Sequence, residues 1–298
     1  VSGLAKAEQP QILPNHCKMK SPLFLLTALA TAALLPACGR QARTDSANDA
    51  PAMRSESICF DAFEYQVSNE LTGSADDYFR ESDLVYTDSI SLVFPVRIGD
   101  KGLDMLRDSI IRLAFDTIGC SIDSIISNYV CNDVRQFSYP TRRVAPVDIF
   151  GADGYELISG SVVNYNPSLL VYEVANSSYS PGAAHGITTR NYLNYDISAG
   201  RLINGSFMFA PGKRAELAQL IARRAAEMTQ VIGPTQIESL PEHDNFYINP
   251  EGEIVFVYQP YEVASYAQGL ISINFFPSEL ADYLTTEALK YFALDDLN

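Results

Sequence analysis

YELISGSVVNYNPSLLVYEVAN, the sequence of residues 155–176, contains two runs rich in β-branched and aromatic side chains on either side of Asn164-Tyr165-Asn166-Pro167. Runs of this composition favour β-strands. Asparagine and proline favour tight turns, because they tolerate or impose the backbone angles that a turn needs. We therefore predict a β-hairpin with strands at Tyr155–Asn166 and Ser168–Asn176.

The residues before this hairpin alternate apolar and polar side chains at Ile58–Val67 and Asp83–Ile98, which predicts two more strands. Pro95 cannot donate a ladder hydrogen bond, so its strand should lie at an edge or come to its end there. Apolar residues spaced three and four apart predict a helix over Leu103–Ile118 that packs on the sheet. The section that follows predicts irregular structure with a short helix at Ile122–Asn128.

The residues after the hairpin continue this mixture of strands and helices. Because strands follow one another through short turns, with helices interspersed, we expect an α+β fold: a mainly antiparallel sheet with helices packed on it. We expect an N-terminal α+β module over residues 58–150 and a C-terminal α+β domain over residues 151–298. The patterns after the hairpin predict a strand at Thr188–Ile197, a helix at Lys213–Thr229, strands at Asn245–Ile248, Glu253–Tyr258 and Leu270–Phe275 that close the sheet, and a last helix from Ser278 to Phe292 behind Pro277.

Residues 19–37 have the pattern of an export signal. Met19 and Lys20 precede an apolar run from Pro22 to Leu35, which is shorter than the roughly 20 apolar residues that span a bilayer. The run ends in Leu35-Pro36-Ala37-Cys38, and small residues before a cysteine are typical of a lipoprotein cleavage site. We interpret Cys38 as the lipidated first residue of the mature chain; the alternative is a secretory signal in which Cys38 is an ordinary thiol.

The remaining N-terminal residues are interpreted from this signal. Residues 1–18 precede the expected initiator methionine and are interpreted as a non-native upstream extension, and residues 38–57 as a disordered polar tether. Acyl chains on Cys38 would hold the protein on a lipid bilayer outside the cytoplasm. Gly39 does not resemble an inner-membrane retention signal, which favours the outer membrane of the cell envelope.

The chain is acidic, with a formal net charge of −15. Removal of residues 1–37 takes away three lysines and one glutamate, which leaves 18 basic and 35 acidic residues and a net charge of −17. Nucleic acid is an improbable ligand, since phosphate binding needs clustered lysine and arginine. The charge favours a basic protein or a calcium ion as partner; the alternative is that acidity merely keeps an exported protein soluble.

Three cysteines remain in the mature chain besides Cys38. An exported protein lives where disulfides persist, so one pair is expected and one thiol is left over. Cys120 and Cys131 are the favoured pair because a local loop joins them, and Cys59 stays open as a partner. Their spacing does not resemble a zinc site.

The sequence offers little for catalysis. The mature chain has two histidines, His185 and His243, without metal-ligand spacing, and it lacks a nucleophile elbow or a phosphate-binding glycine loop. We expect no metal, no cofactor and, on balance, no enzyme. Seventeen tyrosines and fifteen phenylalanines could line a sugar-binding surface, but the absence of tryptophan weakens that idea, and most of these rings should pack in the core.

His185 is the most suggestive polar residue. It lies among small residues in Gly182-Ala183-Ala184-His185-Gly186, just before a predicted strand. One reading is that the loop presents His185 to a ligand. The other is that His185 hydrogen-bonds the loop backbone and fixes its shape, which is the commoner role of histidine in such a turn.

Three segments carry a resemblance to a known family. On these segments, from about Val162 to the end, the chain resembles the RsiV-like domain of unknown function, which is named for a bacterial anti-sigma factor whose outer domain senses lysozyme. Ser89–Phe115 resembles, more weakly, the smaller module that often precedes this domain. The three segments are Ser180–Gly186 ahead of Tyr192-Leu193-Asn194-Tyr195-Asp196 and Gly200, then Asn245-Phe246-Tyr247-Ile248, then Tyr258–Gly269.

The resemblance implies a binding module outside the cytoplasm. Its matching segments make His185, Gly182, Gly186, Tyr258, Tyr261 and Glu262 the candidate ligand-binding residues. The chain departs from the anti-sigma factors because a lipid anchor is expected in place of a membrane span and a cytoplasmic domain, so signalling through a sigma factor is not expected. It also departs from the peptidoglycan deacetylases that carry such modules, because it has no deacetylase domain.

Two hypotheses of function follow. The first is a non-catalytic cell-envelope lipoprotein whose RsiV-like domain binds lysozyme, another basic protein or a wall glycan. The alternative is an enzyme or enzyme accessory that acts on cell-wall polysaccharide, in which His185 and a neighbouring carboxylate would be the acid–base pair. A purely structural role in the envelope stays open as a third.

Overall fold

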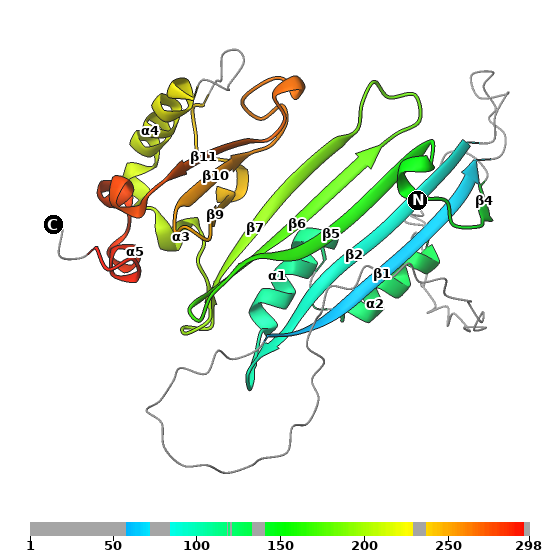
Figure 1. The fold of residues 1–298 in the computed structure, drawn as a ribbon, viewed down its shortest axis with the longest axis horizontal. Coiled ribbons are helices and arrows are strands. Elements are labelled where there is room, and N and C mark those ends of the chain that lie inside the picture. Colours follow the sequence, from blue (N-terminus) through cyan, green and yellow to red (C-terminus); the bar gives the residue numbers. More distant parts are fainter. Residues whose placement is uncertain are drawn as a thin grey trace, which may run out of the picture.

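The computed structural model describes residues 58–71, 84–117, 119, 121–132, 141–228 and 237–294. The expected signal peptide, Cys38 and the tether lie outside these residues. Within them, no helix has the length and apolar composition needed to cross a membrane. The described chain forms two sheets, a broad one and a small one, that lie beside each other (Figure 1).

The broad sheet has eight strands in the described part of the chain. Its order is β4-β1-β2-β5-β6-β7-β8, and β3 pairs with β2. The β2–β5 pair is parallel, and the other pairs are antiparallel. The expected mainly antiparallel α+β fold is confirmed. The strands are β1 (Ile58–Leu71), β2 (Leu84–Ile98), β3 (Lys101–Gly102), β4 (Thr141–Val144), β5 (Gly154–Tyr165), β6 (Leu169–Tyr179), β7 (Ile187–Asp196) and β8 (Arg201–Leu202).

The predicted central hairpin is confirmed as β5 and β6. Its turn is closed by the side-chain oxygen of Asn166, which accepts hydrogen bonds from the backbone N–H groups of Ser168 and Leu169, each at 2.9 Å. This Asx-type bonding is the reason why asparagine favours such turns. The prediction that Pro95 ends its strand or places it at an edge is wrong: β2 lies between β1 and β5, runs on to Ile98, and Pro95 pairs with Phe60 of β1. Pro95 is tolerated because it lies past Leu92, the last residue of β2 that pairs with β5.

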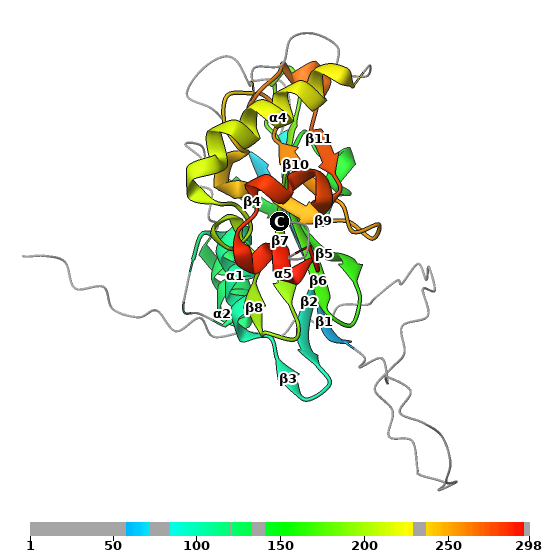
Figure 2. The ribbon, with the colours of Figure 1, turned by 90° about the vertical axis from the view of Figure 1, so that its left-hand side faces the viewer.

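Two helices cover one face of the broad sheet, α1 (Asp104–Phe115) and α2 (Ile122–Asn132), as Figure 2 shows. The apolar spacing that predicted α1 places four of its side chains in the core: Leu106, Ile110, Ile111 and Ala114. They pack against the β2 residues Ile90, Leu92 and Phe94 and the β6 residues Leu170, Tyr172 and Val174. The predicted short helix is confirmed as α2, which runs on past its predicted end to Asn132.

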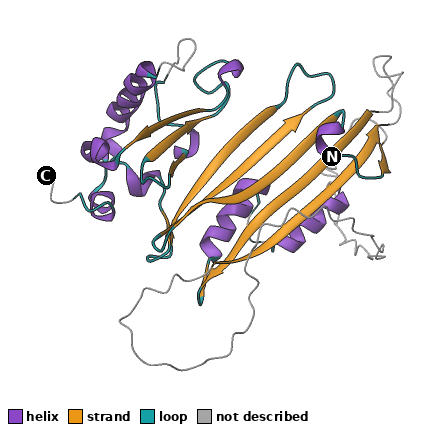
Figure 3. Cartoon of the chain, in the orientation of Figure 1, coloured by secondary structure: helices purple, strands orange, loops and turns teal. Residues whose placement is uncertain are grey.

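The last three strands form a sheet of their own, so the prediction that they close the main sheet is wrong. They are β9 (Phe246–Ile248), β10 (Ile254–Tyr258) and β11 (Ile271–Phe275), in the order β11-β10-β9. The helices α3 (Gly205–Met208), α4 (Arg214–Glu227) and α5 (Thr286–Tyr291) surround this sheet (Figure 3). Its core includes Leu169 and Val171 of β6, so the small module shares its apolar contacts with the broad sheet.

Asn245 explains why the second sheet stays separate. Its side-chain oxygen accepts a hydrogen bond from the backbone N–H of Tyr192 at 3.1 Å, and its amide donates to the carbonyls of Arg190 at 2.8 Å and Val257 at 3.2 Å. Asn245 is 5% exposed. A side-chain amide thus bonds to backbone groups of β7 that a further strand would otherwise use.

Asn194, on β7, makes the reciprocal hydrogen bonds to the backbone of β9. It donates to the carbonyl of Phe246 and accepts from the backbone N–H of Ile248, both at 2.9 Å, and is 3% exposed. The two asparagines therefore join β7 to β9 through side chains, which allows the sheets to meet without a continuous ladder. We call this pair, Asn194 and Asn245, the amide clip.

The predicted last helix is wrong as a single element. A 3₁₀ helix covers Pro277–Tyr283, and α5 begins only after Thr285. Leu284, between them, forms an isolated bridge with Phe209, and the side chain of Thr285 accepts a hydrogen bond from the backbone N–H of Ala288. The side-chain cap of Thr285 begins a new helix, and the bridge between Leu284 and Phe209 fixes the chain where the helix is interrupted.

The boundary expected at residue 150 falls between β4 and β5, and strands from both sides of it pair in the broad sheet. The candidate Cys120–Cys131 disulfide lies outside the described part of the chain, since Cys120 and the side chain of Cys131 are not described. Cys59 lies in β1, opposite Arg97.

Candidate functional site

The His185 loop connects β6 to β7. Its glycines meet two backbone requirements: Gly182 has φ of +81°, and the backbone N–H of Ala183 closes the turn on the carbonyl of Ser180 at 3.0 Å. At Gly186, a β-carbon would lie 2.8 Å from the carbonyl oxygen of Ser178. Glycine is needed at both positions, at the first because of φ and at the second because of the close approach.

His185 joins this loop to the loop between β10 and β11. Its Nδ1 lies 3.0 Å from the carbonyl of Gly186, and its Nε2 lies 3.0 Å from the hydroxyl of Tyr261. Its ring stacks on Tyr266 with centroids 3.5 Å apart and planes at 11°. A neutral imidazole with its hydrogen on Nδ1 satisfies both hydrogen bonds, with the Tyr261 hydroxyl as donor.

Glu262 fixes the second loop. Its two carboxylate oxygens accept hydrogen bonds from the backbone N–H groups of Gln259 and Glu242, each at 2.7 Å. Tyr261, next to it, has φ of +71° and is 58% exposed. A non-glycine residue in the left-handed region is strained and persists where its surroundings impose it, as here next to the anchored Glu262.

Tyr258 lies in the core of the small module and is fully buried. Its hydroxyl donates to the carbonyl of Ser239 at 2.9 Å, and burial raises its pKa well above the ordinary value. Of the six candidate ligand-binding residues, the structure brings His185, Tyr261 and Glu262 together with the two glycines of the loop. Tyr258 lies in the core instead, and its hydroxyl holds the segment before Glu242 through the carbonyl of Ser239.

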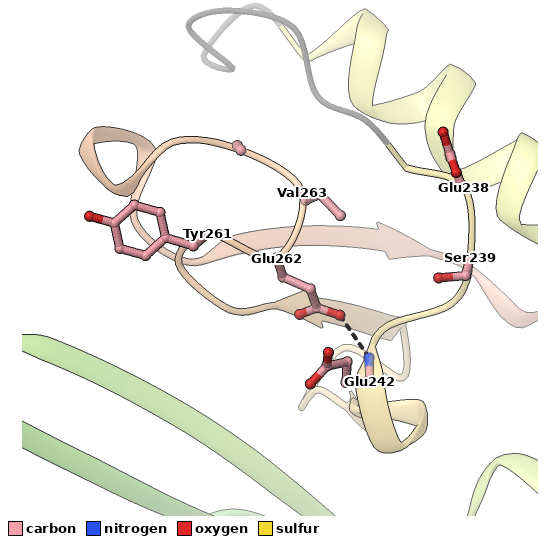
Figure 4. Close-up of a pocket in the computed structure, with 7 residues that line it drawn as sticks. Glu238, Ser239, Glu242, Tyr261, Glu262 and Val263 are labelled. Carbon is pink, nitrogen blue, oxygen red and sulfur yellow. Dashed lines mark hydrogen bonds between the residues drawn. The ribbon is translucent and has the colours of Figure 1, made fainter.

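A pocket of about 550 Å³ opens beside these loops. Figure 4 shows how the segment that carries Glu238 and Glu242 faces the loop that carries Glu262, with the ring of Tyr261 turned away from the carboxyl groups. No cationic residue is among the described residues that line it, which are Glu238, Ser239, Glu242, Tyr261, Glu262, Val263 and Ala264. We call this the acidic pocket.

The pocket differs in chemistry from an acid–base site. The polar partners of His185 are a carbonyl and a phenol rather than the carboxylate that the enzyme hypothesis needs. Among the described residues, no group of three or more histidine, cysteine, aspartate or glutamate side chains could hold a metal ion. The arrangement gathers carboxylates from two segments of the chain, and their negative charge can attract a cation.

A polar network on β6 and β7 adjoins the site. Glu173 forms an ion pair with Arg190 and accepts a hydrogen bond from the hydroxyl of Tyr192 at 2.7 Å. Burial, followed by the bond to Glu173, raises the pKa of Tyr192 well above its ordinary value. Tyr192 stacks on Tyr247 of β9 with centroids 4.4 Å apart. The network thus fastens the small module to the broad sheet beside the amide clip.

Sequence reasoning did not single out Tyr266, Glu238 or Glu242 as site residues. Tyr266 lies within a segment that carried the family resemblance, but spacing could not show that its ring would stack on His185, 81 positions earlier. The two glutamates precede β9 in a run with Pro241 and Asp244, and local acidity was the available signal.

One protein family matches part of the small module. Residues 208–275 match the family described as "Protein of unknown function (DUF3298)". This match covers part of the second half of the chain. The DUF3298 match spans α4 and β9 to β11, including two of the three segments that carry the RsiV-like resemblance. The His185 loop precedes it.

Two solved structures are similar to the chain. The chain is similar to the crystal structure of a member of the DUF3298 family from Bacteroides fragilis, with a TM-score of 0.60, 19% identity, and coverage of 82% of this chain and 99% of the other. At that identity the likeness shows a shared fold. A DUF3298 family protein from Pseudomonas aeruginosa aligns with a TM-score of 0.48 and 14% identity over 78% of this chain and 97% of the other. No curated protein matches the chain.

Proposed function

We propose that this protein is a non-catalytic, lipid-anchored binding protein of the cell envelope whose DUF3298 domain binds a basic protein such as lysozyme. The observation that carries the proposal is the acidic pocket, where Glu238, Glu242 and Glu262 line one space without a cationic residue among its described lining. A lysine or arginine side chain of a partner supplies the missing countercharge.

The carboxylate of Glu262 is held in place before a cation binds. Two backbone hydrogen bonds hold Glu262 in place, so its orientation needs little reordering when a ligand arrives. The exposed ring of Tyr261 stands at the rim and is held by His185, where it can contact the partner's side chain. This arrangement gives the His185 loop a positioning role in binding.

The charge of the whole chain supports the same partner. A net charge of −17 behind Cys38 attracts a cationic protein over several ångströms and raises the rate of encounter at low salt. The RsiV-like resemblance favours lysozyme in particular. The export signal and Cys38 would place the domain outside the cytoplasm, where it can meet such a protein.

Neutralising the pocket tests this proposal. The double variant Glu238→Gln/Glu242→Gln removes two exposed charges and should weaken lysozyme binding by about twofold to thirtyfold, since exposed ion pairs contribute about 0.2–1 kcal/mol each. The matched control is Asp108→Asn/Asp123→Asn, which removes the same charge from the exposed faces of α1 and α2. Equal weakening by both doubles would mean that overall charge, and not the pocket, attracts lysozyme.

A further inference from the structure

The face of the broad sheet opposite α1 and α2 carries no described helix in its central part. Strand register identifies its side chains: Ser91 pairs with Ser159, Ser159 with Ala175, and Leu157 with Ser177. The side chains of Ile90, Leu92 and Ile158, one residue away on β2 and β5, point instead into the core beneath the helices. We call this surface, formed by β2, β5, β6 and the start of β7, the free face (Figure 1).

Hydroxyl groups dominate the free face. The hydroxyls of Ser177 and Thr188 lie 3.0 Å apart, which confirms that neighbouring strands present them on one side. The charged side chains lie at its margins, in Glu64 of β1 and in the Glu173–Arg190 pair. Its hydroxyl-bearing side chains are Ser89, Ser91, Ser159, Ser161, Ser177 and Thr188.

This composition is unusual for the chain. Antiparallel sheets can leave one face in water, but such faces in an acidic protein are expected to carry acidic side chains. Here small hydroxyl-bearing residues, with Leu157 and Ala175 among them, make an uncharged centre on a chain with a net charge of −15. Among the described residues, the centre of this face has no lysine to bind a nucleic acid and no carboxylate to bind a basic protein.

Three aromatic rings border the same face at one end. Phe150 meets Tyr155 edge to face, with ring centroids 6.0 Å apart and planes at 74°, and Tyr155 lies beside Tyr179 with centroids 6.2 Å apart and planes at 37°. Tyr155 and Tyr179 are paired across β5 and β6, on the side of Leu157 and Ser177. The three rings therefore form a row that continues the surface of the serines.

Phe150 is the most exposed member of this row, at 79%. It lies in a 3₁₀ turn, Ile149–Gly151, whose start is capped by Asp148: the carboxylate accepts from the backbone N–H of Phe150 at 3.0 Å, and the carbonyl accepts from that of Gly151 at 2.8 Å. The ring is thus held in water by local structure. A contiguous apolar patch can mark an interaction surface, and Phe150 forms such a patch through its ring contact with Tyr155.

We propose that the free face binds an uncharged glycan chain. The apolar faces of pyranose rings stack on aromatic rings, and their hydroxyl groups exchange hydrogen bonds with serine and threonine hydroxyls. Phe150, Tyr155 and Tyr179 provide the aromatic row without tryptophan, and the serines provide the polar floor. The site is separate from the acidic pocket and does not depend on the function proposed above.

Binding of defined oligosaccharides tests this inference. Isothermal titration of the soluble fragment that follows Cys38, residues 39–298, with the hexamers of N-acetylglucosamine, glucose in β-1,4 linkage and glucose in α-1,4 linkage should show binding of at least one. Phe150→Ala should weaken that binding by about tenfold, as expected for loss of an exposed aromatic anchor. Ser161→Arg, at an exposed position on the floor, should weaken it as well by blocking the surface.

Phe276→Ala is the matched control, because Phe276 is 54% exposed on the small module. It should leave glycan binding unchanged, and Phe150→Ala should leave lysozyme binding unchanged. Failure of all three hexamers to bind, or equal loss with Phe150→Ala and Phe276→Ala, would overturn the inference. A wild-type dimer that Phe150→Ala converts to a monomer, without any glycan binding, would overturn it in favour of self-association.

Discussion

Asn245→Ala should destabilise the fold by about 3 kcal/mol, because it removes half of the amide clip. The side chain of Asn245 makes three hydrogen bonds and is 5% exposed. The carbonyl of Arg190 keeps a second bond, donated by the side-chain amide of Gln259 at 2.7 Å, whereas the backbone N–H of Tyr192 loses the partner that Asn245 supplied. A buried group left without a partner costs about 1–3 kcal/mol, and the two weakened carbonyls add to that.

Urea unfolding of the mature chain, followed by circular dichroism and tyrosine fluorescence, measures this loss. Asn274→Ala is the matched control: Asn274 is exposed on β11, and its amide donates a hydrogen bond to Glu253 at 2.8 Å. It should cost about 0.5 kcal/mol or less. If Asn245→Ala were no more destabilising than Asn274→Ala, the amide clip would not hold the sheets together.

Three further predictions concern single residues. The hydroxyl of Tyr172 is buried without a hydrogen-bond partner among the described residues and would clash with a β-carbon at Gly160, so Gly160→Ala should cost about 1–3 kcal/mol in urea unfolding. Tyr172→Phe should be neutral or stabilising and should reduce that cost; a larger cost in the double variant would contradict the geometry. His185→Ala should lower stability by about 1 kcal/mol and speed proteolysis of its loop, while leaving any wall-linked activity intact; loss of such an activity would favour the enzyme hypothesis. The backbone hydrogen bond from Phe276 lowers the pKa of Glu279, so its stabilising effect is present above the ordinary pKa of about 4.3 and is lost as pH falls through the lower folded-state value. Glu279→Gln should therefore flatten the acid side of a stability–pH curve, and an unchanged slope would refute this assignment.

Local sequence signals predicted the elements of the broad sheet well. The helix at Asp104–Phe115 follows from apolar spacing, and the β5–β6 hairpin follows from the turn chemistry of Asn166 and Pro167. These features depend on residues close in sequence, whose physical preferences act within a few positions. The loop role of His185 was also accessible, since its Nδ1 bonds the backbone of the next residue.

Long-range pairing could not be predicted in the same way. The strands from Phe246 to Phe275 have ordinary strand patterns, and those patterns do not indicate which sheet a strand joins. The decision depends on Asn194 and Asn245, whose amides take hydrogen bonds that a continuous ladder would use. The break after Tyr283 likewise depends on a contact between Leu284 and Phe209, which are 75 positions apart.

The acidic pocket also depends on contacts between residues far apart in the sequence. Glu262 was a candidate from the family resemblance, but Glu238 and Glu242 join it only because β9 and β10 bring the two segments together. The bond from the backbone N–H of Glu242 to the Glu262 carboxylate links segments 20 positions apart. Net charge indicated a basic partner, and the fold indicates where the charge gathers.

Binding of the mature chain to immobilised lysozyme tests the central proposal most directly, with an equally basic unrelated protein as control. Measurements at about 0.01 M and about 0.15 M salt span Debye lengths from about 30 Å to about 8 Å. The proposal predicts tighter binding to lysozyme than to the control at both concentrations, with weaker binding at the higher one. Absence of binding, or equal binding to both proteins, would contradict it.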